Sequence, residues 1–260
     1  MKRNSIRRIF LAVTLVVMTA TTAVAQGYGI AFGDLEVTNA NASDIFGDGK
    51  AYYNPNLNLL TLEEGFEYHL SKNFVTINTG REFGIRLVGN AVIVASVDCE
   101  DDLYIEAATG HSLKITSNIS GSALKCPNLT LKPGVTLELL SRNSQENMFA
   151  LDCADVLTVD HATLNADVTT SPLAVAVRSM TLEGCWLQKP RGGFVSSTVG
   201  GICFGDGLAA KVVRIVTEGF GIEEDGFVET EGRVQKVIED GCLIIIKDGL
   251  RYNVNGQRMR

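Results

Sequence analysis

The chain contains little proline, histidine and tryptophan, with 5, 3 and 1 of its 260 residues. Low proline excludes proline-rich and collagen-like classes, although glycine is present at 26 positions. Lysine and arginine (23) are outnumbered by aspartate and glutamate (30), which gives a net charge of −7 and disfavours nucleic acid as a partner. Apolar residues make up 45% and charged residues 20%, so a packed core is expected. No single motif reveals a chemical activity.

The sequence also has no apolar run long enough to cross a membrane, and its N-terminal apolar run is short. Two basic pairs, Lys2-Arg3 and Arg7-Arg8, precede an apolar run at residues 9–18, and Ala23-Val24-Ala25 then matches a cleavage site before Gln26. A membrane anchor is the alternative, but a bilayer span needs about 20 apolar residues. We therefore predict a signal peptide over residues 1–25, no transmembrane segment in the mature chain, and export to the periplasm, cell surface or extracellular space.

The cysteines reveal a repeat. Cys99, Cys126 and Cys153 are each 27 residues apart, and short apolar alternations such as Leu129-Thr130-Leu131 and Leu157-Thr158-Val159 follow the second and third. Units of 24 to 27 residues hold three strand-like pieces separated by turn residues, and helical periodicity is absent. Three short strands per repeat are typical of one turn of a β-solenoid. The sequence therefore predicts an all-β fold, a right-handed parallel β-helix.

In such a helix the three spaced cysteines lie one above another and point inward. Val177 occupies the equivalent place in the next unit, and valine packs but forms no disulfide. Stacked side chains also run parallel, which does not favour disulfide geometry. We interpret these cysteines as a buried ladder of thiols. Three disulfides are the alternative for an exported chain with six cysteines, and a bond between Cys185 and Cys203 stays open.

The pattern divides the mature chain into four parts. Residues 26–65 form an N-terminal cap module with a hairpin across Asn54-Pro55-Asn56, and residues 66–217 form the β-helix repeats. Residues 218–233 are acidic and glycine-rich and are predicted to be a linker. Residues 234–260 hold three apolar runs separated by two Asp-Gly turns, which predicts a small three-stranded β-meander.

Two segments carry a resemblance to known proteins. Residues 35–62, with the run VTNANASDIFGDG followed by YYNPNLNLLTL, resemble a module found before β-helical repeats in secreted proteins of Bacteroidales and gut Firmicutes. Residues 244–258, which contain YNVNGQ, resemble C-terminal segments of secreted Bacteroidetes proteins that are read as sorting signals. The resemblance implies an adhesin-like or carbohydrate-binding surface protein.

An enzyme is the competing hypothesis, because β-helices include hydrolases and lyases that cleave pectin. Such chemistry needs carboxylates clustered in one groove. Asp101 and Asp155 follow Cys99 and Cys153 by two residues and are the best candidates for such a pair, although turn acids facing water are the ordinary interpretation. The other acids in this region are Glu100, Asp102, Asp152 and Asp160.

The remaining candidates each have a structural explanation. Asp160-His161 places a histidine beside a carboxylate, but a turn histidine is expected. The stretch from Asp44 to Lys50 lacks the alternating acids of a calcium loop and is interpreted as a turn. Trp186 suits either sugar stacking or core packing, and of Tyr52 and Tyr53 one at most is buried. We therefore assign no catalytic, cofactor-binding or metal-binding residue.

The sequence thus favours an exported, non-catalytic β-solenoid that binds glycans or partner macromolecules, or that acts structurally. A polysaccharide-degrading lyase or glycoside hydrolase is the alternative. Ligand and oligomeric state are left open.

Overall fold

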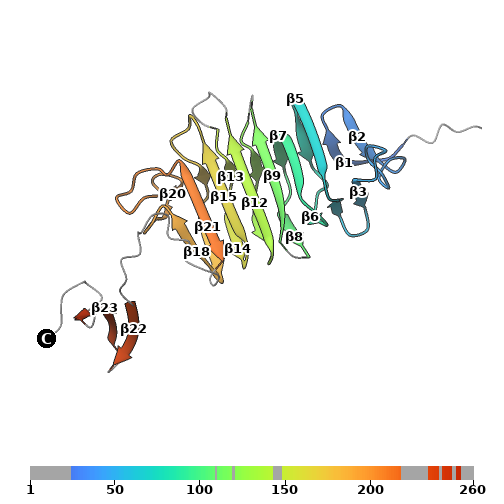
Figure 1. Ribbon diagram of the computed structural model, residues 1–260. Helices are drawn as coiled ribbons and strands as arrows, with labels where there is room; N and C mark the ends of the chain where they lie inside the picture. The colour runs from blue at the N-terminus through green and yellow to red at the C-terminus, as the bar shows by residue number, and fades with distance from the viewer. Residues whose placement is uncertain are drawn as a thin grey trace, which may run out of the picture. The chain divides into compact units, whose positions relative to one another are not determined.

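The computed structural model is built of β-strands and turns (Figure 1). It describes residues 25–108, 110–118, 121–142 and 148–217, and the backbone of three strands between residues 234 and 252. The predicted linker and residues 1–24 of the predicted signal peptide lie outside the described residues. No helix occurs among the described residues, and none is therefore long and apolar enough to cross a membrane. The all-β prediction is confirmed.

The chain divides into two compact units, residues 1–218 and 219–260. In the second unit, three antiparallel strands follow one another in the order β22-β23-β24, so the predicted β-meander is confirmed. Their bounds are β22 Val234–Glu239, β23 Cys242–Lys247 and β24 Leu250–Tyr252.

The first unit is a parallel β-solenoid of about five turns, as predicted. Each turn contributes strands to three ladders, which we call the first, second and third ladders in the order in which the chain passes through them. Neighbouring parallel strands lie about 4.8 Å apart, so side chains at equivalent positions of successive turns contact one another. The inward side chains form one continuous apolar core.

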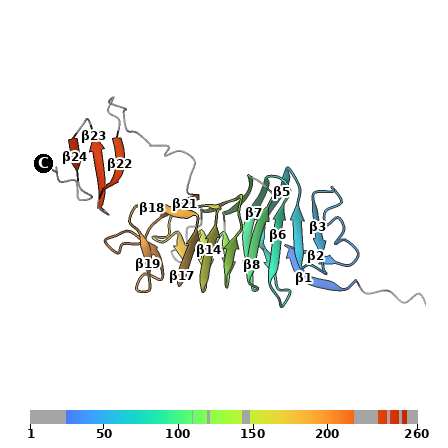
Figure 2. The ribbon, with the colours of Figure 1, turned by 90° about the horizontal axis from the view of Figure 1, so that it is seen from below.

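The first ladder is a separate sheet (Figure 2). Its inward positions carry leucine, isoleucine and valine in register: Leu131 pairs with Ile105 on one side and Val159 on the other, and all three are buried. The alternation of inward and outward residues predicted for these strands therefore places a stack of branched apolar side chains in the core. The strands are β4 Leu59–Leu62, β6 Phe83–Leu87, β8 Leu103–Ala107, β11 Leu129–Leu131, β14 Val156–Asp160 and β17 Ser179–Glu183.

The second and third ladders belong to one sheet because two long strands run through both. The first halves of β5 and β7 pair with each other in the second ladder, and their second halves pair in the third. The first half of β7 then pairs with β9, and its second half with β10. The long strands are β5 Phe66–Ile77 and β7 Ala91–Cys99. The second ladder continues with β9 His111–Ser117, β12 Val135–Ser141 and β15 Thr163–Val168, and the third with β10 Leu124–Cys126, β13 Leu151–Cys153 and β16 Val175–Ala176.

The third ladder holds the cysteine stack. Cys126 pairs with Cys153, and the pairing of Lys125 with Asp98 brings Cys126 beside Cys99. All three are buried free thiols, so the prediction of an inward thiol ladder is confirmed. Burial raises the pKa of the Cys99 thiol to about 12, and the hydrogen bond with Cys153, together with burial, raises that of Cys126 well above its usual value.

Two further cysteines, Cys185 and Cys203, are also buried free thiols on different strands. The disulfide that the sequence left open between them is not formed.

The N-terminal end of the solenoid is covered by antiparallel strands. The hairpin of β3 and β4 caps the first ladder, with its turn across Pro55 as predicted, and β1 pairs with the end of β5. A solenoid needs such caps because the last strand otherwise exposes unpaired backbone groups. The cap strands are β1 Gly27–Phe32, β2 Leu35–Thr38 and β3 Ala51–Asn54.

The other end differs from the sequence prediction, which extended the repeats to residue 217. After β17 the strands pair antiparallel: β21 runs back along β15, and β20 along β16. Trp186 lies on β18, which pairs with β21 instead of continuing the second ladder. Antiparallel strands cover the open edges of both ladders at this end. They are β18 Cys185–Lys189, β19 Phe194–Ser196, β20 Gly201–Cys203 and β21 Val212–Thr217.

Candidate functional site

A column of charged side chains runs along the outer surface of the third ladder. Because side chains alternate along a strand, the residue before each inward cysteine points outward. These residues are Asp98, Lys125 and Asp152, which are paired in register across β7, β10 and β13. The next turn has Ala176 at this position. The column therefore places one ammonium group between two carboxylates.

A cavity of about 260 Å³ lies over this column. Its walls come from two sources, the strands of the third ladder and the connections that lead into β10 and β13. Phe74 of β5 lies at one side and is 37% exposed, and Met148 of the connection before β13 also lines the cavity. The site thus combines charged groups with apolar walls. We call it the Asp152 cavity.

Charge within the Asp152 cavity is unevenly compensated. The Lys125 Nζ atom lies 3.7 Å from Asp98 Oδ1. No donor among the described residues lies within hydrogen-bond or ion-pair distance of the Asp152 carboxylate. Burial is the main cause that raises the pKa of Asp152; the Asp98 charge adds to the effect and Lys125 opposes it. A partly buried carboxylate with a raised pKa in a cavity is typical of a functional site.

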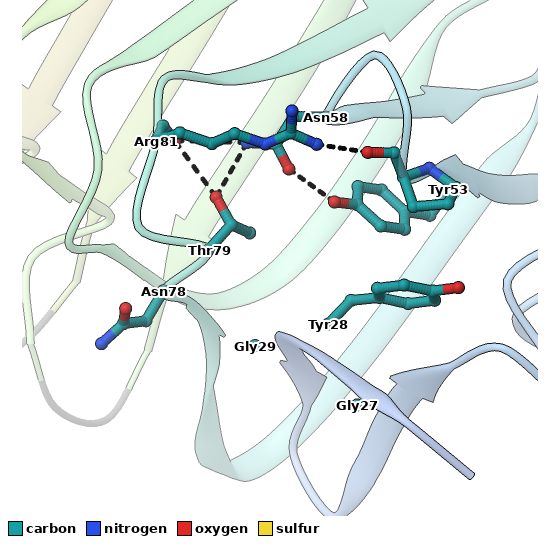
Figure 3. Close-up of a pocket in the computed structure, with 9 residues that line it drawn as sticks. Gly27, Tyr28, Gly29, Tyr53, Asn58, Asn78, Thr79 and Arg81 are labelled. Carbon is teal, nitrogen blue, oxygen red and sulfur yellow. Dashed lines mark hydrogen bonds between the residues drawn. The ribbon is translucent and has the colours of Figure 1, made fainter.

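A second cavity of about 400 Å³ lies near the N-terminal cap (Figure 3). The rings of Tyr28 on β1 and Tyr53 on β3 lie with their centroids 5.2 Å apart and tilted by 55°. Asn78 and Arg81, from the turn after β5, contribute an amide and a guanidinium to the lining. We call it the Tyr28 pocket.

Asn58 fixes the wall of the Tyr28 pocket. It is buried and has a left-handed backbone, with φ of 52°, which asparagine tolerates better than most residues. Its Oδ1 accepts a hydrogen bond from the Tyr53 hydroxyl at 2.5 Å, while its Nδ2 donates to Thr79 Oγ1 at 2.8 Å and to the Glu82 carbonyl at 2.7 Å. The side chain therefore ties β3 to the turn that carries Arg81.

Arg81 supplies the positive charge of the Tyr28 pocket. It donates a hydrogen bond to the Pro55 carbonyl. No carboxylate of the described residues lies within ion-pair distance of its guanidinium. Since a guanidinium has five N–H donors, several remain for a ligand.

The two aspartates that the sequence singled out as an acid pair have separate partners. Asp101 accepts hydrogen bonds from Thr79 N at 2.6 Å, Thr79 Oγ1 at 2.8 Å and Gly80 N at 3.0 Å. Asp155 pairs with Arg178 at 2.6 Å. Asp101 therefore holds the turn of the preceding coil, which agrees with its interpretation as a turn residue.

The neighbouring acids also have structural partners. Glu100 Oε2 accepts from Asn78 Nδ2 at 2.5 Å, and Asp102 Oδ1 accepts from Asn128 Nδ2 at 2.7 Å. Asp160 lies 2.6 Å from His161 Nδ1, and this histidine is exposed in a turn with φ of 44°.

The remaining sequence candidates are placed as follows. Asp44 Oδ1 accepts from the backbone N–H groups of Gly47, Asp48 and Gly49, which is the arrangement of a turn and not of a calcium site. Trp186 is 39% exposed on β18. Tyr53 is buried, whereas Tyr52 is half-buried and bonds to Glu63.

From the sequence, Asp152 was named among the available acids and Tyr53 as one of a tyrosine pair, but the other residues of the two sites were missed. Asp98 and Lys125 were recognisable, because each directly precedes a cysteine of the ladder. Tyr28 and Arg81 gave no such signal, since they are far apart in the sequence and meet through the pairing of β1 with β5.

The described part of the chain holds no cluster of three or more histidine, cysteine, aspartate or glutamate side chains suited to a metal ion. Comparisons with protein-family models, curated proteins and solved structures gave no match for this chain.

Proposed function

We propose that this chain is an exported, non-catalytic β-solenoid that binds an extracellular glycan. The observation that carries the proposal is the Tyr28 pocket, in which the half-buried Tyr28 ring lies against the buried Tyr53 ring and beside an amide and a guanidinium. The apolar faces of sugar rings stack on aromatic side chains, and their hydroxyls take hydrogen bonds from planar polar groups. Such a mixture is typical of small-ligand sites.

The geometry of the acids favours binding over cleavage. A polysaccharide-degrading enzyme needs carboxylates that face a common substrate. Asp101 and Asp155, the pair expected for that role, are bound to Thr79 and Arg178. The Asp152 cavity holds two carboxylates, but a lysine lies between them. The enzyme hypothesis therefore remains the weaker alternative.

A glycan array tests the proposal with four variants. Tyr28→Ala and Arg81→Ala alter the pocket, while Tyr52→Ala and Arg86→Ala are matched controls on residues outside its lining. We expect the wild-type chain to bind at least one glycan, and each pocket variant to lose about tenfold or more in affinity, as expected for one lost charged hydrogen bond or stacked ring. The controls should bind like the wild type.

Two results would contradict the proposal. One is a wild-type chain that binds no glycan, in which case a pull-down from host and bacterial surfaces tests for a protein partner. The other is equal loss of binding in the pocket variants and their controls. If neither the array nor the pull-down detects binding, a structural role is left.

A further inference from the structure

The Asp152 carboxylate is the uncompensated charge of the third ladder. A carboxylate that loses part of its hydration normally gains a hydrogen-bond donor or a cation in exchange. Among the described residues the nearest cation is Lys125, whose ammonium lies beside Asp98 instead. The carboxylate therefore faces the cavity with acceptor capacity that the described residues do not use.

The cavity next to this carboxylate is kept open by a glycine. Gly121 has a φ of 80°, and a Cβ at this position would lie 2.7 Å from Cε1 of Phe74 and 3.0 Å from Oγ of Ser96. Any larger residue would push into the aromatic ring that forms the wall. The backbone thus allows the Phe74 ring to lie at the edge of the hollow, where a ligand can reach its face.

Size and charge restrict the ligand. At about 260 Å³ the hollow lies just below the ~300–1,000 Å³ of typical small-ligand pockets, so it accommodates a single sugar ring, such as one unit of a longer oligomer. Two carboxylates against one ammonium leave the column with net negative charge, which favours a cation. Phe74 adds an aromatic face and Met148 a thioether, and both accept the apolar side of a ring that carries a positive group.

We propose that the Asp152 cavity binds an amino sugar with a free, protonated amine, with the Asp152 carboxylate as its counter-ion and Phe74 against the sugar ring. This site shares no lining residue with the Tyr28 pocket, so its existence does not depend on glycan binding there. An ammonium-to-carboxylate hydrogen bond is about twice as strong as a neutral one, which makes the amine the group that decides affinity.

Calorimetry with two matched probes tests this proposal. A glucosamine hexamer and an N-acetylglucosamine hexamer share a backbone, but acetylation removes the positive charge. The wild-type chain should bind the free-amine hexamer about tenfold or more tightly than the acetylated one, because a charged hydrogen bond is lost. Asp152→Asn keeps the shape of the side chain and should abolish this preference.

Asp155→Asn is the control for general attraction between an acidic protein and a cationic oligomer. It removes one negative charge from the same solenoid turn as Asp152, at an exposed residue that is paired with Arg178. The preference should persist in this variant. Equal loss in both variants, or a wild-type chain that does not distinguish the two hexamers, would overturn the proposal.

A lysine-bearing peptide is the other cationic ligand to measure. Tighter, Asp152-dependent binding of trilysine than of the glucosamine hexamer would overturn the assignment to a sugar. Circular dichroism melts of both variants establish that each is folded. Failure of these tests leaves the glycan-array test of the Tyr28 pocket unaffected, and the reverse also holds.

Discussion

Lys125 and Asp152 are register partners on neighbouring parallel strands, yet the Lys125 ammonium lies within ion-pair distance of Asp98 on the opposite strand instead. The lysine thus stabilises the charge of one neighbour and leaves the other exposed to the cavity. Because of this asymmetry, replacing Asp152, and not Asp98, tests how an uncompensated carboxylate affects stability and ligand binding.

Asp152→Asn should stabilise the fold at neutral pH. The folded chain raises the pKa of Asp152 above its ordinary value of 3.8, chiefly by burial, so the folded state holds this proton more tightly than the unfolded state. The contribution of Asp152 to stability is therefore greatest at low pH and falls as the pH rises above 3.8 through the folded-state pKa. We expect Asp152→Asn to raise the free energy of unfolding at pH 7 and to leave it nearly unchanged at pH 3.

Urea unfolding at the two pH values measures this difference. Asp155→Asn again serves as the control, because an exposed ion pair contributes only about 0–1 kcal/mol, and its loss should destabilise slightly. A destabilised Asp152→Asn chain at pH 7 would contradict the idea that its carboxylate lacks compensation.

Cys126 offers a test of the core. Val177 continues the third ladder one turn beyond Cys153, so the interior accepts valine at an equivalent place. Cys126→Val should therefore fold with a stability within about 1.5 kcal/mol of the wild type. Cys126→Ser buries a hydroxyl among apolar side chains and should cost about 1–3 kcal/mol.

Chemical denaturation of the two variants checks this order. A serine variant as stable as the valine variant would show that the position is not in an apolar interior.

Repetition explains how much of the fold was predictable. The spacing of 27 residues between Cys99, Cys126 and Cys153 indicates that each turn places a small apolar side chain at the same inward position. The register of β10 with β13, in which Cys126 pairs with Cys153, follows from this spacing. The alternation of leucine and threonine predicted the first ladder for the same reason. Inward positions are restricted by packing, and their pattern is therefore visible in the sequence.

Features that break the repeat were not predictable. The long strands β5 and β7 join two ladders where later turns have separate strands, and the spacing of the repeat does not encode this difference. The antiparallel cap that contains Trp186 covers a strand edge, which a repeat pattern does not encode.

The two sites differ in the same way. The charged column lies one residue from a predicted repeat position, whereas the acids expected to form a pair were Asp101 and Asp155, three residues further on. The Tyr28 pocket depends on how the cap winds over β5, which is a tertiary contact between distant residues. A local sequence pattern reveals positions within a repeat, but it does not reveal contacts between residues that are distant in the sequence.

The reduced cysteine ladder fixes the register on which the charged column and its cavity depend, and a thiol titration without reductant tests it most directly. The described cysteines are at most 6% exposed, so the folded chain should react at no more than one of its six thiols, Cys242. In denaturant all six should react. Fewer reactive thiols in the unfolded, unreduced chain would reveal disulfides and contradict the account.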